Sequence, residues 1–201
     1  MGSLQKQKKS IKRIKSKKEK KVKKQERLTA EQVAKWFIDN AQQEAHELTH
    51  SKMQGLLYYA KGFNYVFTGK PLYNEGIVKT ENAPIVEEIY KLYDSKTFKR
   101  LEGLPTIDDE ITSCILEFVN LKAGSRKDEE LLTCIRGDKF WEVSKNGEKL
   151  NEEDMRYDFR GTYLCGVKPN NLDIKDDDIT KVISDTTLIK NREAYAELKY
   201  L

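Results

Sequence analysis

Residues 48–90 constrain the fold of this chain more than any other stretch, because glycine and proline mark where its helices end and begin. A helix is predicted to start near Thr49 or Ser51, and its apolar side chains recur at helical spacing. Gly69 suits the end of that helix, and Pro71 prevents it from continuing. Its buried face is expected to contain Met53, Leu56, Leu57, Ala60, Phe63 and Phe67.

The segment that follows is expected to contain a minor β element and then a third helix. Residues 72–80 are short and partly β-like, which allows a small hairpin or strand pair. Pro84 suits the first turn of a helix, where its missing N–H group is not needed. The apolar face of this helix would carry Ile85, Val86, Ile89, Tyr90 and Tyr93.

Helical patterns continue on both sides of this stretch. Thr29 and Gln32 form a capping box at the start of the first ordered helix. Further helices are predicted over residues 108–122, from Ser125 or Asp128 through Ile135, from Asn151 toward Phe159 and over residues 191–199, while residues 162–167 allow a strand. The predicted fold class is therefore mainly α, a compact multi-helix domain with a minor β element.

The charges are divided unevenly along the chain. Residues 1–28 contain 13 Lys and Arg against 2 Asp and Glu, a formal charge of +11, whereas residues 29–201 carry −7. Like charges at helical spacing repel, so this Lys-rich arm is expected to be disordered when free. The arm suits nonspecific contact with nucleic-acid phosphates, and a solvated tail without a partner is the alternative. The side chains that would contact phosphates are Lys12, Arg13, Lys15, Lys17, Lys18, Lys20, Lys21, Lys23 and Lys24.

Composition excludes several classes of protein. No run of about 18 apolar residues is present, and the N-terminus lacks the apolar segment of a secretory signal. Cys114, Cys134 and Cys165 are odd in number and widely spaced, so reduced thiols in the core are expected rather than disulfides. These features predict a cytoplasmic chain that has no membrane contact.

His46, Glu47 and His50 match the zinc-protease pattern H-E-x-x-H. In such an enzyme both histidines project from one face of a continuous helix, and the glutamate activates the zinc-bound water. Here a helix is expected to begin at Thr49, and a break between the two ligands would destroy their geometry. The chain has 2 histidines in all, so a third ligand would have to be a carboxylate such as Glu75. An interhelical turn is the preferred interpretation, and a zinc metalloprotease is the remote alternative.

Other catalytic patterns are absent from the sequence. It contains neither a glycine-rich phosphate loop nor the G-x-S-x-G elbow of a hydrolase. The run Asp176-Asp177-Asp178 lacks the glycine and terminal glutamate of a calcium loop, so it is interpreted as a solvated or helix-capping run. The sequence predicts no catalytic residue, no metal site and no cofactor.

The order of residues from Leu48 to Glu75 resembles the Panacea antitoxin domain, a family long catalogued as phage-associated GepA-like proteins. The central helix of that family is similar to L-T-n-x-K-L-Q-K-L-L-Y-Y-A-x-G, and the turn after it to G-K-P-L-F-x-E. The matching residues are Leu48, Thr49, Lys52, Gln54, Leu56, Leu57, Tyr58, Tyr59, Ala60, Gly62, Gly69, Lys70, Pro71, Leu72, Tyr73 and Glu75. The family's opening helix is matched by Thr29, Val33, Ala34 and Phe37.

The second half of the chain departs further from the family pattern. The family's A-W-x-x-G-P-V has become a stretch that ends in Ala83, Pro84 and Ile85, without the tryptophan and the glycine. Trp141 resembles the tryptophan that follows L-T-H in the family, although Cys134 replaces the histidine. The resemblance covers about residues 29–160. Residues 161–201 form a C-terminal extension that is expected to pack on the domain with a last helix.

The resemblance implies an antitoxin of a bacterial or phage type II toxin–antitoxin system. Such a protein neutralises a cognate toxin by direct stoichiometric binding and is not an enzyme. A protease is a further implied partner, because one relative is thought to deliver its toxin to one. The matched residues are expected to be mostly structural, with partner binding as an additional role. The alternative is a nucleic-acid-associated accessory or adaptor protein that uses residues 1–28.

Overall fold

The computed structural model describes residues 27–40, 48–92, 101, 103–165 and 172–198, with the backbone alone over residues 191–198. Within these ranges the chain is mainly helical, with eight α-helices, one π-helical segment and one sheet of two strands. The predicted class, mainly α with a minor β element, is confirmed. No helix in these ranges has the length and apolar character needed to cross a bilayer.

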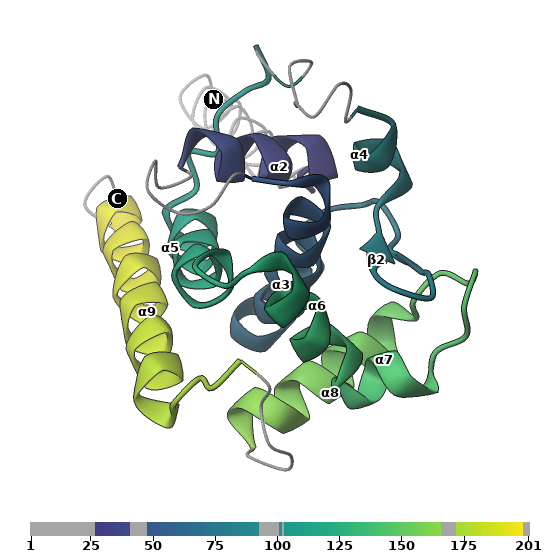
Figure 1. Ribbon diagram of the computed structural model, residues 1–201. Helices are drawn as coiled ribbons and strands as arrows, with labels where there is room; N and C mark the ends of the chain where they lie inside the picture. The colour runs from purple at the N-terminus through teal and green to yellow at the C-terminus, as the bar shows by residue number, and fades with distance from the viewer. Residues whose placement is uncertain (1–26, 41–47, 93–100, 102, 166–171, 199–201) are drawn as a thin grey trace, which may run out of the picture.

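Helix α3, His50–Thr68, lies at the centre of the fold (Figure 1). The Thr49 side chain accepts a hydrogen bond from the backbone N–H of Lys52 and so caps its start. Gly69 caps its end with φ 72°, a left-handed conformation that favours glycine. The predicted helix and both of its predicted ends are confirmed. Of its 19 residues 15 are buried, so other elements pack around most of its circumference.

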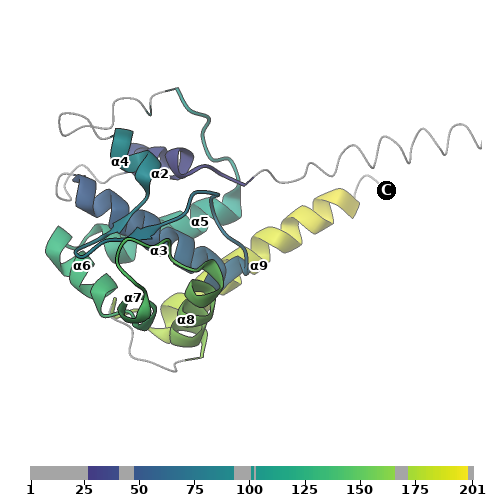
Figure 2. The same ribbon diagram turned by 90° about the vertical axis from the view of Figure 1, so that its right-hand side faces the viewer.

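The remaining elements surround α3 (Figure 1). They are α2 (Ala30–Asp39), β1 (Val78–Lys79), β2 (Pro84–Ile85), α4 (Glu87–Leu92), α5 (Glu110–Val119), the π-helix η2 (Asn120–Gly124), α6 (Asp128–Arg136), α7 (Lys139–Val143), α8 (Glu152–Leu164) and α9 (Asp176–Leu198). Helices α2, α5, α6 and α8 pack directly on α3, whereas α9 packs chiefly on α5. The C-terminal end of α9 projects beyond the body of the molecule (Figure 2).

Local capping chemistry starts α2 and α8 where the sequence predicts. Thr29 and Gln32 form the predicted capping box of α2. The Asn151 side chain accepts hydrogen bonds from two backbone N–H groups in the first turn of α8. The acidic run at residues 176–178 lies in the first turn of α9, where negative charge interacts favourably with the helix dipole.

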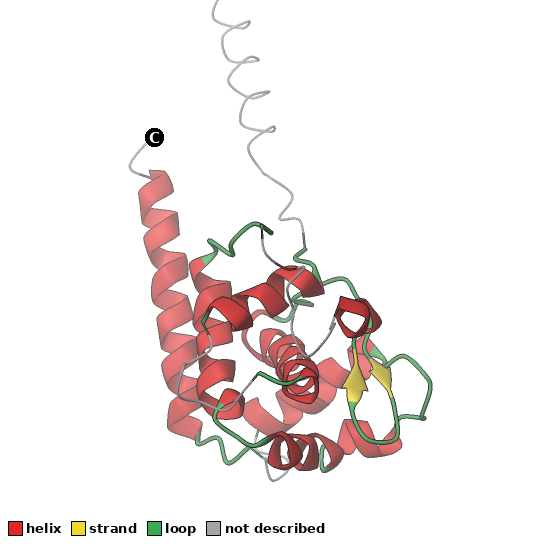
Figure 3. Ribbon diagram, turned by 45° about the horizontal axis from the view of Figure 1, so that its top comes forward, coloured by secondary structure: helices red, strands yellow, loops and turns green. Residues whose placement is uncertain are grey.

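The two strands form an antiparallel pair in which Val78 lies opposite Ile85 (Figure 3). The predicted strand pair is confirmed, but the prediction that Pro84 begins a helix is wrong, because Pro84 lies in β2. The Gln54 side chain of α3 accepts a hydrogen bond from the backbone N–H of Val86 at 2.7 Å. This contact lies between the strand and α4, and it explains why the helix begins later than the proline indicates.

The strand that the sequence allows at residues 162–167 is not formed over residues 162–164, since α8 continues through Leu164. Thr162 and Tyr163 are buried and extend the face of α8 that already buries Phe159. An apolar run of this kind fits a buried helix face as well as a strand, and contact with α3 decides between them. Residues 166–167 lie outside the described ranges.

Helix α6 begins at Asp128, one of its two predicted starts, with Lys127 in the cap position. The predicted start of the last helix is wrong. The last helix, α9, begins at residue 176 instead of residue 191. Its buried side chains recur at helical spacing but are separated by polar residues, and they are Ile179, Val182, Thr186 and Ile189.

Phe159 of α8 makes the main aromatic contact with α3. Its ring centroid lies 5.6 Å from that of Tyr58, 6.1 Å from that of Tyr59 and 5.7 Å from that of Phe63. Gly62 permits this close approach, because a Cβ atom at that position would lie 2.1 Å from the Phe159 ring. The two helices can therefore pack this closely only with glycine at residue 62.

The substitution Gly62→Ala should lower the free energy of unfolding by about 1–3 kcal/mol, because the added methyl group displaces the Phe159 ring from a close-packed core. Urea denaturation of the two proteins measures this difference. Gly161→Ala in α8 is the matched control, since a Cβ atom there meets nothing within 4 Å. It should leave stability unchanged or raise it by up to about 1 kcal/mol. Equal effects of the two substitutions would contradict this account of the α3–α8 contact.

Candidate partner-binding site

The polar side chains at the start of α3 contact two neighbouring elements. Lys52 is 2% exposed, and its ammonium group donates a hydrogen bond to the Gly124 carbonyl oxygen at the end of η2 at 3.0 Å. The Thr49 hydroxyl donates to the Asp128 carboxylate at the start of α6. Burial lowers the pKa of Lys52, and the charges of Asp128 and Glu130 oppose that shift. These contacts attach η2 and α6 to the first turns of α3.

Gln54 joins α3 to the segment between β2 and α4. Its side-chain oxygen accepts from the Val86 N–H at 2.7 Å, and its amide nitrogen donates to the Val86 carbonyl at 3.4 Å. The Gln54 side chain therefore forms hydrogen bonds with both the backbone N–H and the backbone carbonyl of the buried residue Val86. The position of β2 and α4 depends on this side chain.

The tyrosines of α3 lie in the middle of the helix. Tyr58 donates to the Asp138 carboxylate at the start of α7 at 3.1 Å, and burial raises the pKa of this phenol. The Tyr59 hydroxyl is buried and has no hydrogen-bond partner in the described ranges. The carbonyl oxygen of Leu57 accepts from the Tyr73 hydroxyl at 3.0 Å. These matched residues therefore lie in the core.

Lys61 is 1% exposed and interacts with two segments at once. Its ammonium group donates to the Glu75 carbonyl oxygen at 2.9 Å and to the Glu152 carboxylate at 2.6 Å, while Tyr65 donates to the other Glu152 oxygen at 3.0 Å. Burial alone would raise the pKa of Glu152, but Lys61 and Tyr65 outweigh it, so the pKa lies below its ordinary value. The role of Lys61 is not predicted from the sequence. The signal for it is the position of this lysine in a helix whose neighbouring residues are almost all apolar.

The turn after α3 contains the remaining matched residues. Leu72 is buried, and the Glu75 carboxylate accepts a hydrogen bond from the Ala30 N–H at 2.9 Å, at the first residue of α2. Pro71 is half-buried. Lys70 differs from the other matched residues because its side chain is exposed. The matched stretch therefore reaches solvent at Lys70.

Pro84 in strand β2 and Trp141 in α7 are both buried. Lys79, which pairs with Pro84, is 8% exposed and donates to the Trp141 carbonyl oxygen at 2.5 Å. The same ammonium group lies 5.1 Å from the centroid of the Trp141 ring. A third buried lysine thus joins the hairpin to α7.

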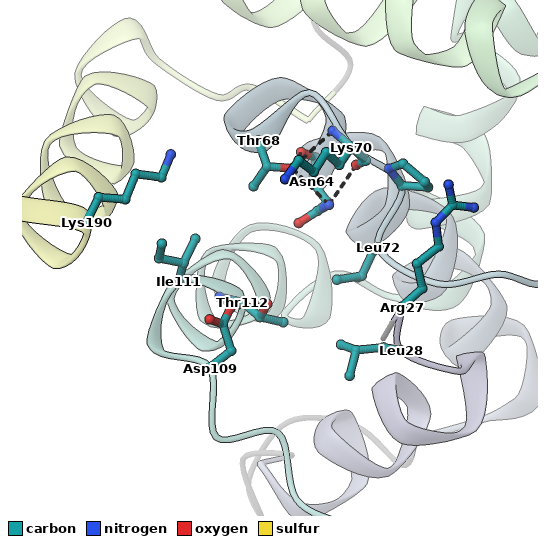
Figure 4. A pocket seen from close by; sticks show the side chains of 11 residues that line it. Arg27, Leu28, Asn64, Thr68, Lys70, Leu72, Asp109, Ile111, Thr112 and Lys190 are labelled. Carbon is teal, nitrogen blue, oxygen red and sulfur yellow. Dashed lines mark hydrogen bonds between the residues drawn. The ribbon is translucent and has the colours of Figure 1, made fainter. Parts of the chain in front are cut away.

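A pocket of about 430 Å³ lies beside the exposed turn (Figure 4). It lies between the C-terminal end of α3, the start of α5 and the side of α9. Its basic side chains are Arg27, Lys70 and Lys190, and its apolar side chains are Leu28, Pro71, Leu72 and Ile111. The sequence did not predict this pocket, because its residues are widely separated along the chain.

Asn64 and Asp109 of the pocket differ in the hydrogen bonds that they form with the rest of the fold. Asn64 donates both amide hydrogens, to the Thr68 hydroxyl at 3.1 Å and to the Lys70 carbonyl at 2.7 Å. Its carbonyl oxygen is directed into the pocket (Figure 4). The Asp109 carboxylate accepts from the backbone N–H of Thr112 at 2.8 Å and caps α5. The pocket therefore offers exposed cations and one amide acceptor over an apolar floor.

The H-E-x-x-H pattern does not lie in one helix. Thr49 is extended, with φ −70° and ψ 164°, and α3 begins only at His50, so the predicted break is confirmed. The His50 ring packs edge-on against Tyr90 with centroids 4.7 Å apart, and burial lowers its pKa. His46 and Glu47 lie outside the described ranges. Within those ranges no group of three His, Cys, Asp or Glu side chains could bind a metal ion.

Most of the basic arm lies outside the described ranges, including all nine candidate phosphate-contacting residues from Lys12 to Lys24. Leu28 is described and pairs with Tyr73 in a parallel bridge. Its carbonyl oxygen accepts from the Asn74 N–H at 3.3 Å. Since Arg27 lines the pocket, the arm joins the folded body beside it.

The three cysteines are free thiols. Cys134 is buried and Cys114 is half-buried, as expected for core residues. Cys165 is exposed, so the expectation of a core position is wrong for this residue.

No family model, curated protein or solved structure matches the chain. The resemblance to the Panacea domain therefore rests on the residues quoted above, chiefly residues 48–75. Function is inferred from those residues and from the geometry of the pocket.

The substitution Glu152→Gln should destabilise the chain at neutral pH, because it leaves the buried Lys61 ammonium without its opposite charge. The loss should be about 1 kcal/mol, since the carboxylate is partly exposed and screened by solvent. The folded pKa of Glu152 is lowered, so the advantage of the natural residue is complete above the ordinary carboxyl pKa of about 4.3. It should disappear as the pH falls through the lowered value.

Urea denaturation across this pH range measures the difference in unfolding free energy. Glu153→Gln is the matched control, because its side chain is exposed on the same turn of α8 and forms no ion pair in the described ranges. It should change stability little at any pH. If the difference in unfolding free energy between Glu152→Gln and the natural chain persists unchanged in strong acid, the ion pair is not its cause.

Proposed function

We propose that this chain is a Panacea-type antitoxin, which binds a cognate protein toxin stoichiometrically in the cytoplasm and blocks it without catalysis. The observation that carries the proposal is the family-like stretch at residues 48–75. In the fold this stretch forms one continuous unit, the central helix α3 and the turn after it. Most of its matched side chains are buried, which supports a scaffold role for the pattern and leaves partner contact to the surface.

The electrostatics of the folded part support a protein partner. Residues 29–201 carry a formal charge of −7. An acidic body attracts a basic toxin surface over long range and speeds association, while buried contacts at the interface determine how slowly the complex dissociates. Binding to such a toxin should therefore weaken as salt is added. A protease that receives the toxin is a further proposed partner.

A second candidate function is supported by the arm. Residues 1–28 carry +11, which suits nonspecific binding to phosphate groups. In that case the chain is an accessory or adaptor protein: the arm binds nucleic acid, and the folded body binds another protein. The two proposals differ in whether the arm is required.

The proposed function is tested by purifying the tagged full chain from its native host, with nuclease treatment, and identifying the bound proteins by mass spectrometry. A small stoichiometric protein that is toxic when expressed alone, and harmless when co-expressed with this chain, is expected. A variant without residues 1–26 should protect equally well, because the deletion preserves the Leu28–Tyr73 pairing.

The same deletion should abolish retention on nucleic acid. If the deletion removes both protection against the toxin and retention on nucleic acid, the accessory-protein candidate is favoured. Recovery of ribosomal or nucleoid proteins alone, all released by nuclease, would contradict the antitoxin proposal.

A further inference from the structure

The pocket beside Lys70 has the opposite charge to the body that contains it. Residues 29–201 carry −7, yet Lys70 and Lys190 of this range line the pocket, together with Arg27 from the end of the basic arm. Asp109 is its only acidic side chain among the described residues, and its carboxylate is already engaged by Thr112. The pocket is therefore a local site for negative charge on a body of net negative charge.

Two of the cations approach the pocket from separate elements. Lys70 belongs to the turn after α3, and Lys190 belongs to α9 (Figure 4). Both side chains are exposed, and neither forms an ion pair with a residue in the described part of the chain. Their ammonium groups are available to anionic oxygens of a ligand. Arg27 adds a third charge but also lies near Glu152, whose pKa it helps to lower.

The interior of the pocket is suited to a peptide. Asn64 is 5% exposed, and its side-chain carbonyl oxygen faces the pocket, while both amide hydrogens are donated within the fold. Such an acceptor matches a backbone N–H group of an extended chain. Leu72 and Ile111 supply apolar surface beneath it. Acceptor, cations and apolar floor together match the groups that an acidic, partly apolar peptide presents.

We propose that this pocket binds a short extended segment of the protein partner in which acidic and apolar residues alternate. Carboxylates of the segment pair with Lys70 and Lys190, a backbone N–H group donates to Asn64, and an apolar side chain packs on Leu72 and Ile111. The inference rests on the proposed function for the partner that supplies the segment. A nucleic-acid strand fits less well, because no aromatic side chain among the described lining residues could stack a base.

Binding is measured by fluorescence anisotropy with a short labelled peptide of alternating glutamate and leucine, using the full chain. Lys70→Glu combined with Lys190→Glu should weaken binding about tenfold, because both charge pairs become repulsive. The matched control combines Lys139→Glu with Lys145→Glu, two exposed positions elsewhere on the surface. Both double variants change the net charge equally and retain the basic arm, so the control should bind within about twofold of the natural chain.

Two further probes separate the alternatives. A peptide of alternating lysine and leucine should not bind the natural chain at the pocket, and an oligothymidylate should bind both double variants equally through the arm. If both double variants bind the acidic peptide equally weakly, the proposal is overturned, because the arm or the net charge would then explain binding. Selective loss of the oligothymidylate in the pocket variant would assign the pocket to phosphate instead.

The pocket assignment and the proposed function can fail independently of each other. If the purified partner binds the Lys70→Glu, Lys190→Glu variant as tightly as the natural chain, the pocket assignment fails and the binding function stands. If the acidic peptide binds at the pocket but no protein partner is recovered from the host, the antitoxin proposal fails and the pocket assignment stands.

Discussion

Two buried lysines in the central helix constrain the rest of this fold. An ammonium group taken from water costs several kcal/mol unless hydrogen bonds and opposite charge replace the lost hydration. Lys61 finds these at the Glu75 carbonyl and the Glu152 carboxylate, and Lys52 finds a carbonyl at Gly124. Because these acceptors belong to different surrounding segments, none of those segments can shift independently of α3. Gln54 and Tyr58 extend the same arrangement to the hairpin and to α7.

Sequence reasoning succeeded where structure is set by neighbouring residues. Thr49 and Gly69 mark the ends of α3, because capping needs a side-chain acceptor at one end and a left-handed residue at the other. Sequence-based prediction failed where contacts between residues far apart in the chain determine the structure. Pro84 fits a helix start by itself, but the Gln54–Val86 contact keeps its segment out of α4. The pocket depends on tertiary contacts in the same way, and no local pattern joins Lys70 to Lys190.

The division between buried and exposed residues bears on how function is arranged. The family-like positions other than Lys70 are buried or half-buried, so most of the pattern describes how the scaffold is assembled. The pocket combines Lys70, from the family-like turn, with Lys190, from the C-terminal extension beyond the resemblance. In the proposed function, a family-like scaffold is thus completed by a segment that lies outside the resemblance. That arrangement would let related scaffolds bind different partners.

Native-state hydrogen exchange of the full chain, followed by mass spectrometry, tests the central role of α3 most directly. If the polar contacts of α3 link the surrounding elements, amides of residues 50–68 exchange only on global unfolding and are the slowest in the molecule. Amides of α9, which packs chiefly on α5, exchange faster through local opening. An α3 that exchanges faster than α5 or α8 would contradict the account, because the central helix could then open while its surroundings stay folded.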